Sequence, residues 1–340
     1  MKNSSYLILP HGAMIFNGIH SCDVSEVAAK RIQEFPQQLR YDCNELYNSC
    51  IKAVKIVAES KPDLIILNTP HGISLTDSIG VYVNGQAKGN AEWNQNWSEF
   101  EVDIHLDSNI ANLLVEHLRK DGIPTEGISA FSRTEIPLRW GEVIPIWFLK
   151  EITKIGVKVV IFSNPIHFVK GLAPVSERVQ IGRSIGKFIR NLPHKVLYVV
   201  SGDLAHTHKT DCELPLYLPD PRWEIPLPAD ERVPLDFDIA VENWIKGIPF
   251  TQDVFSTPIK SIEEIITTWD VHVAKDAENW LVKATKLKGQ ALSCGIYGFG
   301  ILHGLLISEI ELGTRFQVNF LCRLAPTYYG MMVAAIVVEK

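Results

Sequence analysis

The chain has 340 residues, 46% of them hydrophobic, which suits one large α/β domain and excludes a disordered protein. Its net charge is −6 and no Lys/Arg-rich run stands out, so we expect no nucleic-acid partner. Neither a membrane-length apolar run nor a signal-peptide pattern is found. Six scattered cysteines without a Cys-x-x-Cys pair are typical of reduced thiols. The expectation is a cytoplasmic protein with no membrane contact.

Short apolar runs alternate with longer amphipathic segments along the chain. Four runs rich in Val, Ile and Leu predict strands buried on both faces, namely Tyr6–Leu9, Leu64–Asn68, Val157–Ser163 and Val196–Ser201. Apolar residues at helical spacing predict helices at Gln38–Ser60, Asp107–Lys120 and Glu177–Leu192, with Asp107 and Ser108 as N-cap candidates. The order predicts an α/β fold in which a wound mixed sheet is flanked by helices, forming a single domain over residues 1–340.

Some segments depart from this alternation. The Gly/Asn-rich stretch Tyr82–Glu101 predicts a loop or hairpin. Residues 207–238 carry six prolines, which favours a lid or mobile insert. Phe316–Cys322 and Met331–Val338 are expected to be two strands that close an edge of the sheet.

Polar side chains follow each of the four predicted strands. The first strand leads into "LPHG" with His11 and the second into "NTPHG" with His71, two near-copies of one pattern 60 residues apart. The third leads to His167, and the fourth to Asp203 and His206 in "SGDLAH". Ligands of open α/β sheets bind at the carboxyl ends of the strands, so we expect these groups to converge at one rim.

Neutral imidazole is a common metal ligand, and two histidines with one carboxylate suit non-haem Fe(II). The matched pair His11 and His71 therefore predicts a metal site, the alternative being ordinary turn histidines. His206 is a candidate acid/base group, the alternative being plain hydrogen bonding. Trp140 and Glu142, in "RWGEVIPIWFL", mark either a helix N-terminus or a pocket wall on which a flat substrate stacks.

Six motifs taken together resemble the class III extradiol ring-cleavage dioxygenase family, whose type member is the LigB catalytic subunit of protocatechuate 4,5-dioxygenase. They occur in the order "LPHG", "NTPHG", "GEVIPIWFL", "GRSIGKFI", "SGDLAH" and "CGIYGFGILHGLL…YYGMMVA". The resemblance runs from Leu9 to about Val338, and the Memo-like proteins are a related branch. It implies a LigB/Memo-like fold and a non-haem Fe(II) held by two His and a Glu. By position, His11 and His71 match the histidine ligands and His206 matches the acid/base histidine.

The chain departs from the family pattern at two places. Trp140 stands where the family often has a second active-site histidine. The window Gln290–Gly298, where the carboxylate ligand is expected, contains no Asp or Glu, and Cys294 lies there instead, as in Memo-like proteins. A thiolate ligand would shift the preference from iron towards zinc or copper. Alternatively, Glu142 or Asp203 completes the ligand set, or Cys294 is an ordinary small buried residue.

The expected function is Fe(II)-dependent extradiol ring opening of a small catechol or aminophenol with O2. In that reading His11, His71 and Cys294 hold the metal, His206 is catalytic, and the substrate contacts are Trp140, Glu142, His167 and Asp203. The resemblance also implies a homodimer or a heteromer with a paralogous subunit. The alternative is a Memo-like copper or zinc protein, or a subunit without dioxygenase activity. A zinc hydrolase ranks last, because no His-Glu-x-x-His signature occurs.

Overall fold

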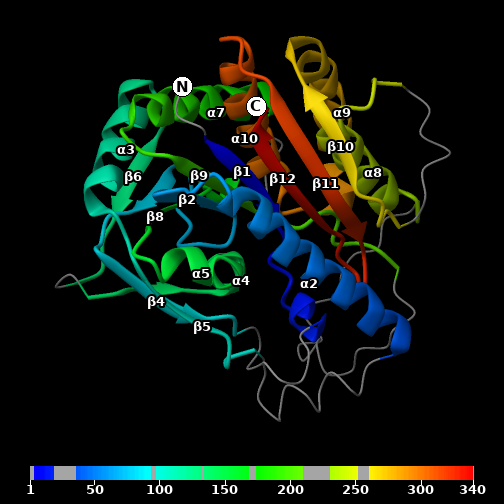
Figure 1. Ribbon diagram of the computed structural model, residues 1–340, viewed down its shortest axis with the longest axis horizontal. Helices are drawn as coiled ribbons and strands as arrows, with labels where there is room; N and C mark the ends of the chain where they lie inside the picture. The colour runs from blue at the N-terminus through cyan, green and yellow to red at the C-terminus, as the bar shows by residue number, and fades with distance from the viewer. Residues whose placement is uncertain are drawn as a thin grey trace.

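The computed structural model describes residues 4–18, 36–92, 97–131, 134–167, 174–209, 230–251 and 260–339 (Figure 1). The main sheet has nine strands in the order β10 (Ile265–Trp269), β11 (Phe316–Leu324), β12 (Met331–Val338), β1 (Ser5–Leu9), β9 (Val196–Ser201), β2 (Leu64–Thr69), β8 (Lys158–Ser163), β3 (Ile79–Tyr82) and β6 (Thr125–Ile128). A second sheet has three strands, β5 (Glu101–His105), β4 (Gln86–Asn90) and β7 (Ile136–Leu138). The mixed α/β fold class is as predicted.

The centre of the main sheet is parallel. The strands β1, β9, β2 and β8 run in one direction, with Leu9 beside Ser201 and Thr69 beside Ser163 at their carboxyl ends. Antiparallel pairing of β12 with β1, and of β3 with β8, makes the sheet mixed. All four predicted strands form, and their carboxyl ends share one rim.

Helices cover both faces of the main sheet (Figure 1). One face packs against α3 (Ser108–Lys120), α7 (Val175–Asn191), α8 (Val233–Lys246), α9 (Val271–Ala291) and α10 (Ile296–Ile310). The other packs against η1 (Ala13–Gly18), α2 (Gln37–Ala58), α4 (Trp140–Phe148), α5 (Lys150–Thr153) and the smaller sheet. Successive residues of β1 alternate between these two cores, as the period of a strand requires.

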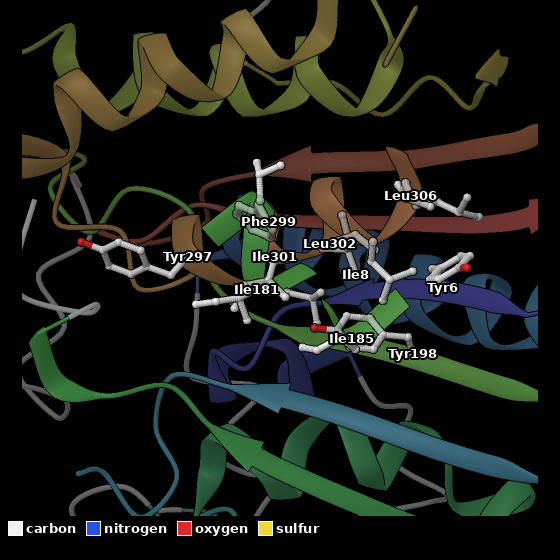
Figure 2. Close-up of a cluster of buried hydrophobic side chains, with 14 of the residues drawn as sticks. Tyr6, Ile8, Ile181, Ile185, Tyr198, Tyr297, Phe299, Ile301, Leu302 and Leu306 are labelled. Atoms are coloured by element: carbon white, nitrogen blue, oxygen red, sulfur yellow. The ribbon is translucent and has the colours of Figure 1, made fainter. Parts of the chain in front are cut away.

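The core on the α7 and α10 side is built from aliphatic and aromatic contacts. Figure 2 shows Tyr6 and Ile8 of β1 with Tyr198 of β9, beside isoleucines and leucines of α7 and α10. Every one of these three strand side chains is at most 1% exposed. This two-sided burial explains why the central strands are continuous apolar runs rather than alternating ones.

The predicted helices agree with α2, α3 and α7 to within about two residues at each end, which is the usual spread of helix boundaries. The predicted N-cap Asp107 is confirmed, since its carboxylate accepts a hydrogen bond of 3.0 Å from the backbone of Ile110. Of the loop or hairpin expected over Tyr82–Glu101, the structure forms the strand β4, whose partner β5 begins at the last residue of that range.

One expectation needs correction, and another lies mostly outside the described residues. The strands β11 and β12 do not close the sheet, because β12 pairs with β1 and the edge is formed by β10, which was not predicted. Of the segment 207–238 expected as a lid or insert, residues 210–229 lie outside the described residues, and its end belongs to α8. Within the described part of the chain, no helix has both the length and the apolar character needed to cross a membrane.

Candidate metal centre

Three strand ends bring candidate ligands to one rim. His11 lies two residues beyond β1, His71 two beyond β2, and Asp203 two beyond β9. Because these strands are parallel and adjacent, the equal spacing places the three residues at the same level of the sheet edge. Cys294 joins them from the short turn between α9 and α10.

The ligand atoms of His11, His71 and Cys294 all lie within 4.8 Å of one another. The Cys294 sulfur is 3.3 Å from His11 Nε2, and the two imidazole rings meet edge to face with 4.8 Å between their centres. The ligand atoms of Asp203, His206 and Cys294 form a second group in which all lie within 4.8 Å of one another. Cys294 therefore belongs to both groups.

A hydrogen-bond relay sets the tautomer of His11. The Ser201 hydroxyl donates its single proton to the Gly141 carbonyl at 2.6 Å, so it must accept at 2.8 Å from His11 Nδ1–H. The other ring nitrogen, Nε2, then carries a lone pair and faces Cys294 and Asp203. This is the arrangement of a metal-binding histidine whose second nitrogen is held by the protein.

Asp203 links both groups. Its Oδ1 accepts a 3.0 Å hydrogen bond from the backbone of His11, and its Oδ2 lies 3.5 Å from His11 Nε2. Its own backbone N–H donates to the Cys294 sulfur at 3.4 Å. A carboxylate thus lies beside the imidazole and the thiol, although none occurs near Cys294 in the sequence.

Burial dominates the protonation of these groups. It lowers the pKa of His11 and His71 to about 3, helped in each case by a neighbouring imidazole, and lowers the pKa of His206 to about 4 despite the opposing charge of Asp203. It raises the pKa of Asp203 to about 6. Burial also raises the pKa of the Cys294 thiol, and the negative charge of Asp203 adds to this. The three imidazoles are therefore neutral at pH 7 and able to act as ligands or bases.

The loop that carries His206 is anchored on both sides. The Asp238 carboxylate of α8 accepts from the Ala205 backbone at 2.9 Å and contacts His208 Nε2 at 2.7 Å. The His206 backbone N–H donates to the Ala291 carbonyl at the end of α9, at 2.7 Å. His206 Nε2 is left 3.7 Å from the Cys294 sulfur.

The family described as the catalytic LigB subunit of aromatic ring-opening dioxygenase matches residues 30–216, which is more than half of the chain. The chain belongs to this LigB family. The matched range includes His71, Asp203 and His206. His11 and Cys294 lie outside it, and it is the fold that brings them to the same rim.

Two further likenesses are more distant. Protein CA_C1420 of Clostridium acetobutylicum is 22% identical over 161 residues, covering 46% of this chain and 33% of that protein. The chain thus spans about a third of the length of this curated relative. The crystal structure of uncharacterized protein JW3007 from Escherichia coli K12 matches with a TM-score of 0.50 and 14% identity, covering 98% of this chain and 99% of that one. This likeness concerns the fold alone.

The structure separates the residues expected to contact substrate in this LigB-family chain. Trp140 is half-buried beside His71, with 5.3 Å between ring centres, and so borders the metal-ligand group. His167 lies outside both groups; its side chain is 40% exposed and its Nδ1 is 2.9 Å from the Thr76 carbonyl. The assignment of His167 to the pocket therefore has no support in the geometry.

Glu142 also differs from its expected role. The residue is 1% exposed, and both carboxylate oxygens are engaged, one by the Tyr82 hydroxyl at 2.7 Å and the other by the Arg139 backbone at 3.0 Å. It closes the first turn of α4 as a capping residue, which is the helix N-terminus alternative. Neither metal-ligand group contains Glu142, so Asp203 is the carboxylate that the fold supplies.

Residues that sequence reasoning missed complete the surroundings of His206. The ring centres of Tyr328 and Tyr329 lie 6.3 and 5.9 Å from that of His206. Tyr329 also packs so closely on Gly12 that a side chain at that glycine would clash with its ring. The signal was the motif "TYYG" before β12, which by itself indicates only a turn.

Proposed function

We propose that this chain is a metal-dependent ring-opening dioxygenase that acts on a small catechol or aminophenol with O2, and that Fe(II) is its metal. The supporting observation is the convergence of His11, His71, Asp203, His206 and Cys294 at the strand-end rim of a LigB-family fold. Two neutral imidazoles with a neighbouring carboxylate are the donor types that non-haem iron uses.

The residues present fit a bound metal ion. The lone pair on His11 Nε2 points at the other candidate ligands, and the hydroxyl of Ser201 holds its second nitrogen. His71 and Cys294 would complete the group of three, with Asp203 next to them. Bound iron would supply the Lewis-acid and one-electron chemistry that ring opening with oxygen needs.

The chain's own groups have separate tasks in this proposal. His206, neutral at pH 7, accepts a proton from the substrate hydroxyl through Nε2 and later returns one. Trp140 beside His71 and Tyr329 beside His206 provide flat apolar walls for an aromatic ring. The burial of His11, Asp203 and Cys294 limits the access of water to the ligand groups.

The test is metal content followed by oxygen uptake. We would purify the protein anaerobically, load it with Fe(II), and measure oxygen consumption with a panel of catechols and aminophenols. We expect turnover with at least one of them, and loss of iron in His71→Ala. An iron-loaded protein that consumes no oxygen with any member of the panel would contradict the proposal.

The role of His206 has its own prediction. His206→Ala should keep the metal and slow turnover by roughly 10²–10⁴-fold, the usual contribution of a general acid/base. His167→Ala is the control, since the His167 side chain is 40% exposed and belongs to neither ligand group. Equal turnover of His206→Ala and wild type would remove His206 from the mechanism.

A second candidate is favoured by Cys294. Its sulfur lies in both ligand groups, and a thiolate prefers zinc or copper to iron, so the chain would be a metal-binding protein without dioxygenase activity. Cys294→Ser should then weaken zinc and copper binding strongly. Retained iron binding and turnover in Cys294→Ser would instead favour the dioxygenase with Asp203 as the third ligand.

A further inference from the structure

Two buried cations share one tyrosine ring outside the candidate metal centre. Arg178, in the first turn of α7, is 0% exposed, and Lys288, in the last turn of α9, is 4% exposed. The Arg178 guanidinium carbon lies 3.8 Å from the centre of the Tyr297 ring. The Lys288 Nζ lies 4.2 Å from the same centre and contacts the Tyr297 hydroxyl. The two positive charges are therefore no more than about 8 Å apart.

The guanidinium group of Arg178 lacks the partners that a buried charge normally has. Within the part of the chain that the structure describes, none of its three nitrogens makes a hydrogen bond. Tyr297 offsets part of the desolvation through its ring face and its hydroxyl group, but no guanidinium N–H reaches it with hydrogen-bonding geometry. Native proteins pair such groups almost without exception, so an unpaired buried guanidinium indicates a ligand.

The helix ends around Arg178 add to the positive potential. Gly182 of α7 approaches Ile301 of α10, and Gly186 approaches Ser308, so residue numbers rise together along both helices. The two helices are thus parallel, and their N-termini lie at the same end, beside Arg178 and Tyr297. The positive ends of the two helix dipoles favour an anion at this end.

The cations belong to the same rim as the candidate metal centre. Tyr297 follows Cys294 by three residues, and the loop of His206 is hydrogen-bonded to the end of α9 that carries Lys288, including a 3.0 Å bond from Thr207 to the Gln290 carbonyl. Figure 2 shows Tyr297 at one end of the core cluster, with its hydroxyl directed away from the other labelled side chains. A ligand on the two cations would therefore be a neighbour of this loop.

We propose that Arg178 and Lys288 form a buried anion site, next to the candidate metal centre, that binds the carboxylate group of a small organic acid. The planar N–H fork of arginine matches the two oxygens of a carboxylate, and the lysine supplies a second charge. The proposal does not depend on ring-opening activity. In support, burial lowers the pKa of Lys288 to about 7, and the positive charge of Arg178 adds to this.

The test uses sodium acetate as the probe on the full chain, with sodium chloride at equal ionic strength as the reference. Dissociation constants come from the rise of the thermal unfolding midpoint. We expect acetate to bind wild type, and to bind Arg178→Met and Lys288→Met at least about tenfold more weakly, the loss typical of a charged hydrogen-bond partner. Replacing an unpaired buried arginine with methionine is compatible with folding, and Lys288→Met tests the site independently.

Matched controls come from the same helices. Arg183→Met on α7 removes an arginine that is paired with Glu311, and Lys283→Met on α9 removes a lysine stacked near Trp280. Both should bind acetate like wild type. The carboxylate could belong to the substrate of the metal centre or to a separate organic acid. If it belongs to the substrate, Arg178→Met should weaken the binding of a carboxylated catechol but not that of catechol itself.

His71→Ala separates this site from the proposed function. Acetate binding that survives His71→Ala and fails in Arg178→Met supports the anion site whatever the metal centre does. Acetate binding that fails in His71→Ala and survives in Arg178→Met overturns the proposal, because the carboxylate then binds the metal. Tight binding of inorganic phosphate without binding of acetate would also overturn it, by assigning the cations to a tetrahedral oxyanion.

Discussion

At the scale of single residues, the hydroxyl of Ser201 determines which nitrogen of His11 can bind a metal. One short relay, from His11 Nδ1–H to Ser201 and on to the Gly141 carbonyl, keeps Nε2 unprotonated and oriented towards Cys294. Burial then keeps the ring neutral. Protonation and orientation are thus set by neighbours that do not themselves bind the ion.

Ser201→Ala should weaken metal binding without unfolding the protein. Without the acceptor, the proton of His11 has no preferred nitrogen, and loss of such a supporting contact typically weakens a metal site by roughly 10–100-fold. Chelator competition with Zn²⁺ as a redox-inert probe measures the dissociation constant. Ser184→Ala, which removes a buried serine bonded to Asp121, is the control. Equal Zn²⁺ affinity of the Ser201 variant and wild type would contradict the relay.

Glu142 should make stability fall as the pH rises. Burial raises the pKa of Glu142 from its usual 4.5 to about 7 in the folded protein, so the fold binds this proton more tightly than the unfolded chain does. The proton on Glu142 contributes fully to the free energy of unfolding below pH 4.5, and this contribution is lost as the pH rises through 7. Glu142→Gln keeps a capping side chain but has no group that titrates. Its free energy of unfolding, relative to that of wild type, should therefore rise by about 2–3 kcal/mol from pH 5 to pH 8. Urea unfolding at both values measures this, and a difference that does not change with pH would refute it.

At the scale of elements, glycines allow α7 and α10 to pack with their backbones in contact. A Cβ at Gly304 would lie 2.1 Å from the Val179 carbonyl oxygen, and one at Gly182 would lie 2.0 Å from that of Ile301. The close packing brings Arg178 onto Tyr297, three residues from Cys294. The positions of the turn with Cys294 and of Arg178 therefore depend on one helix pair.

Gly304→Ala should destabilise the protein, whereas Gly289→Ala should not. The new methyl group at position 304 has to push backbone atoms apart, which costs about 1–3 kcal/mol or more. At Gly289 of α9 a Cβ meets nothing within 4 Å, so alanine should add about 0.5–1 kcal/mol through the unfolded state. Denaturant unfolding of both variants checks the opposite signs, and two variants of equal stability would show that the helices can move apart.

At the scale of the whole molecule, the candidate centre joins the two ends of the chain. His11 and Cys294 are 283 residues apart in sequence, and β1 lies between β12 and β9 in the sheet. The ligands come from the ends of three parallel strands and from the turn that connects α9 to α10. A bound metal ion would thus link segments that only the complete fold brings together.

Metal should raise the thermal stability of the intact chain. A ligand that binds only the folded state at 100 times its dissociation constant stabilises it by about 2.7 kcal/mol. We expect Zn²⁺ to raise the unfolding midpoint of wild type, and His11→Ala and His71→Ala to stay folded but to lose this response. Collapse of both variants with or without metal would show that the histidines are structural.

Much of the fold and part of the site follow from the sequence. The apolar runs predict the four central strands, Asp107 predicts the start of α3, and the repeated Pro-His-Gly ending indicates that His11 and His71 share a rim. These are local patterns whose meaning depends only on backbone periodicity and on the shared direction of parallel strands. The sheet edge at β10 was not predicted, because strand order depends on pairing between segments far apart in the chain.

The sequence by itself determined an α/β fold of the LigB type with His11, His71 and His206 at the strand ends. Only the tertiary structure decided the rest of the site. It placed Cys294 and Asp203 beside His11, engaged both oxygens of Glu142 within the protein, and left His167 outside. The physical reason is that a ligand set depends on side-chain directions and on helix packing across hundreds of residues, and no local period or spacing encodes these.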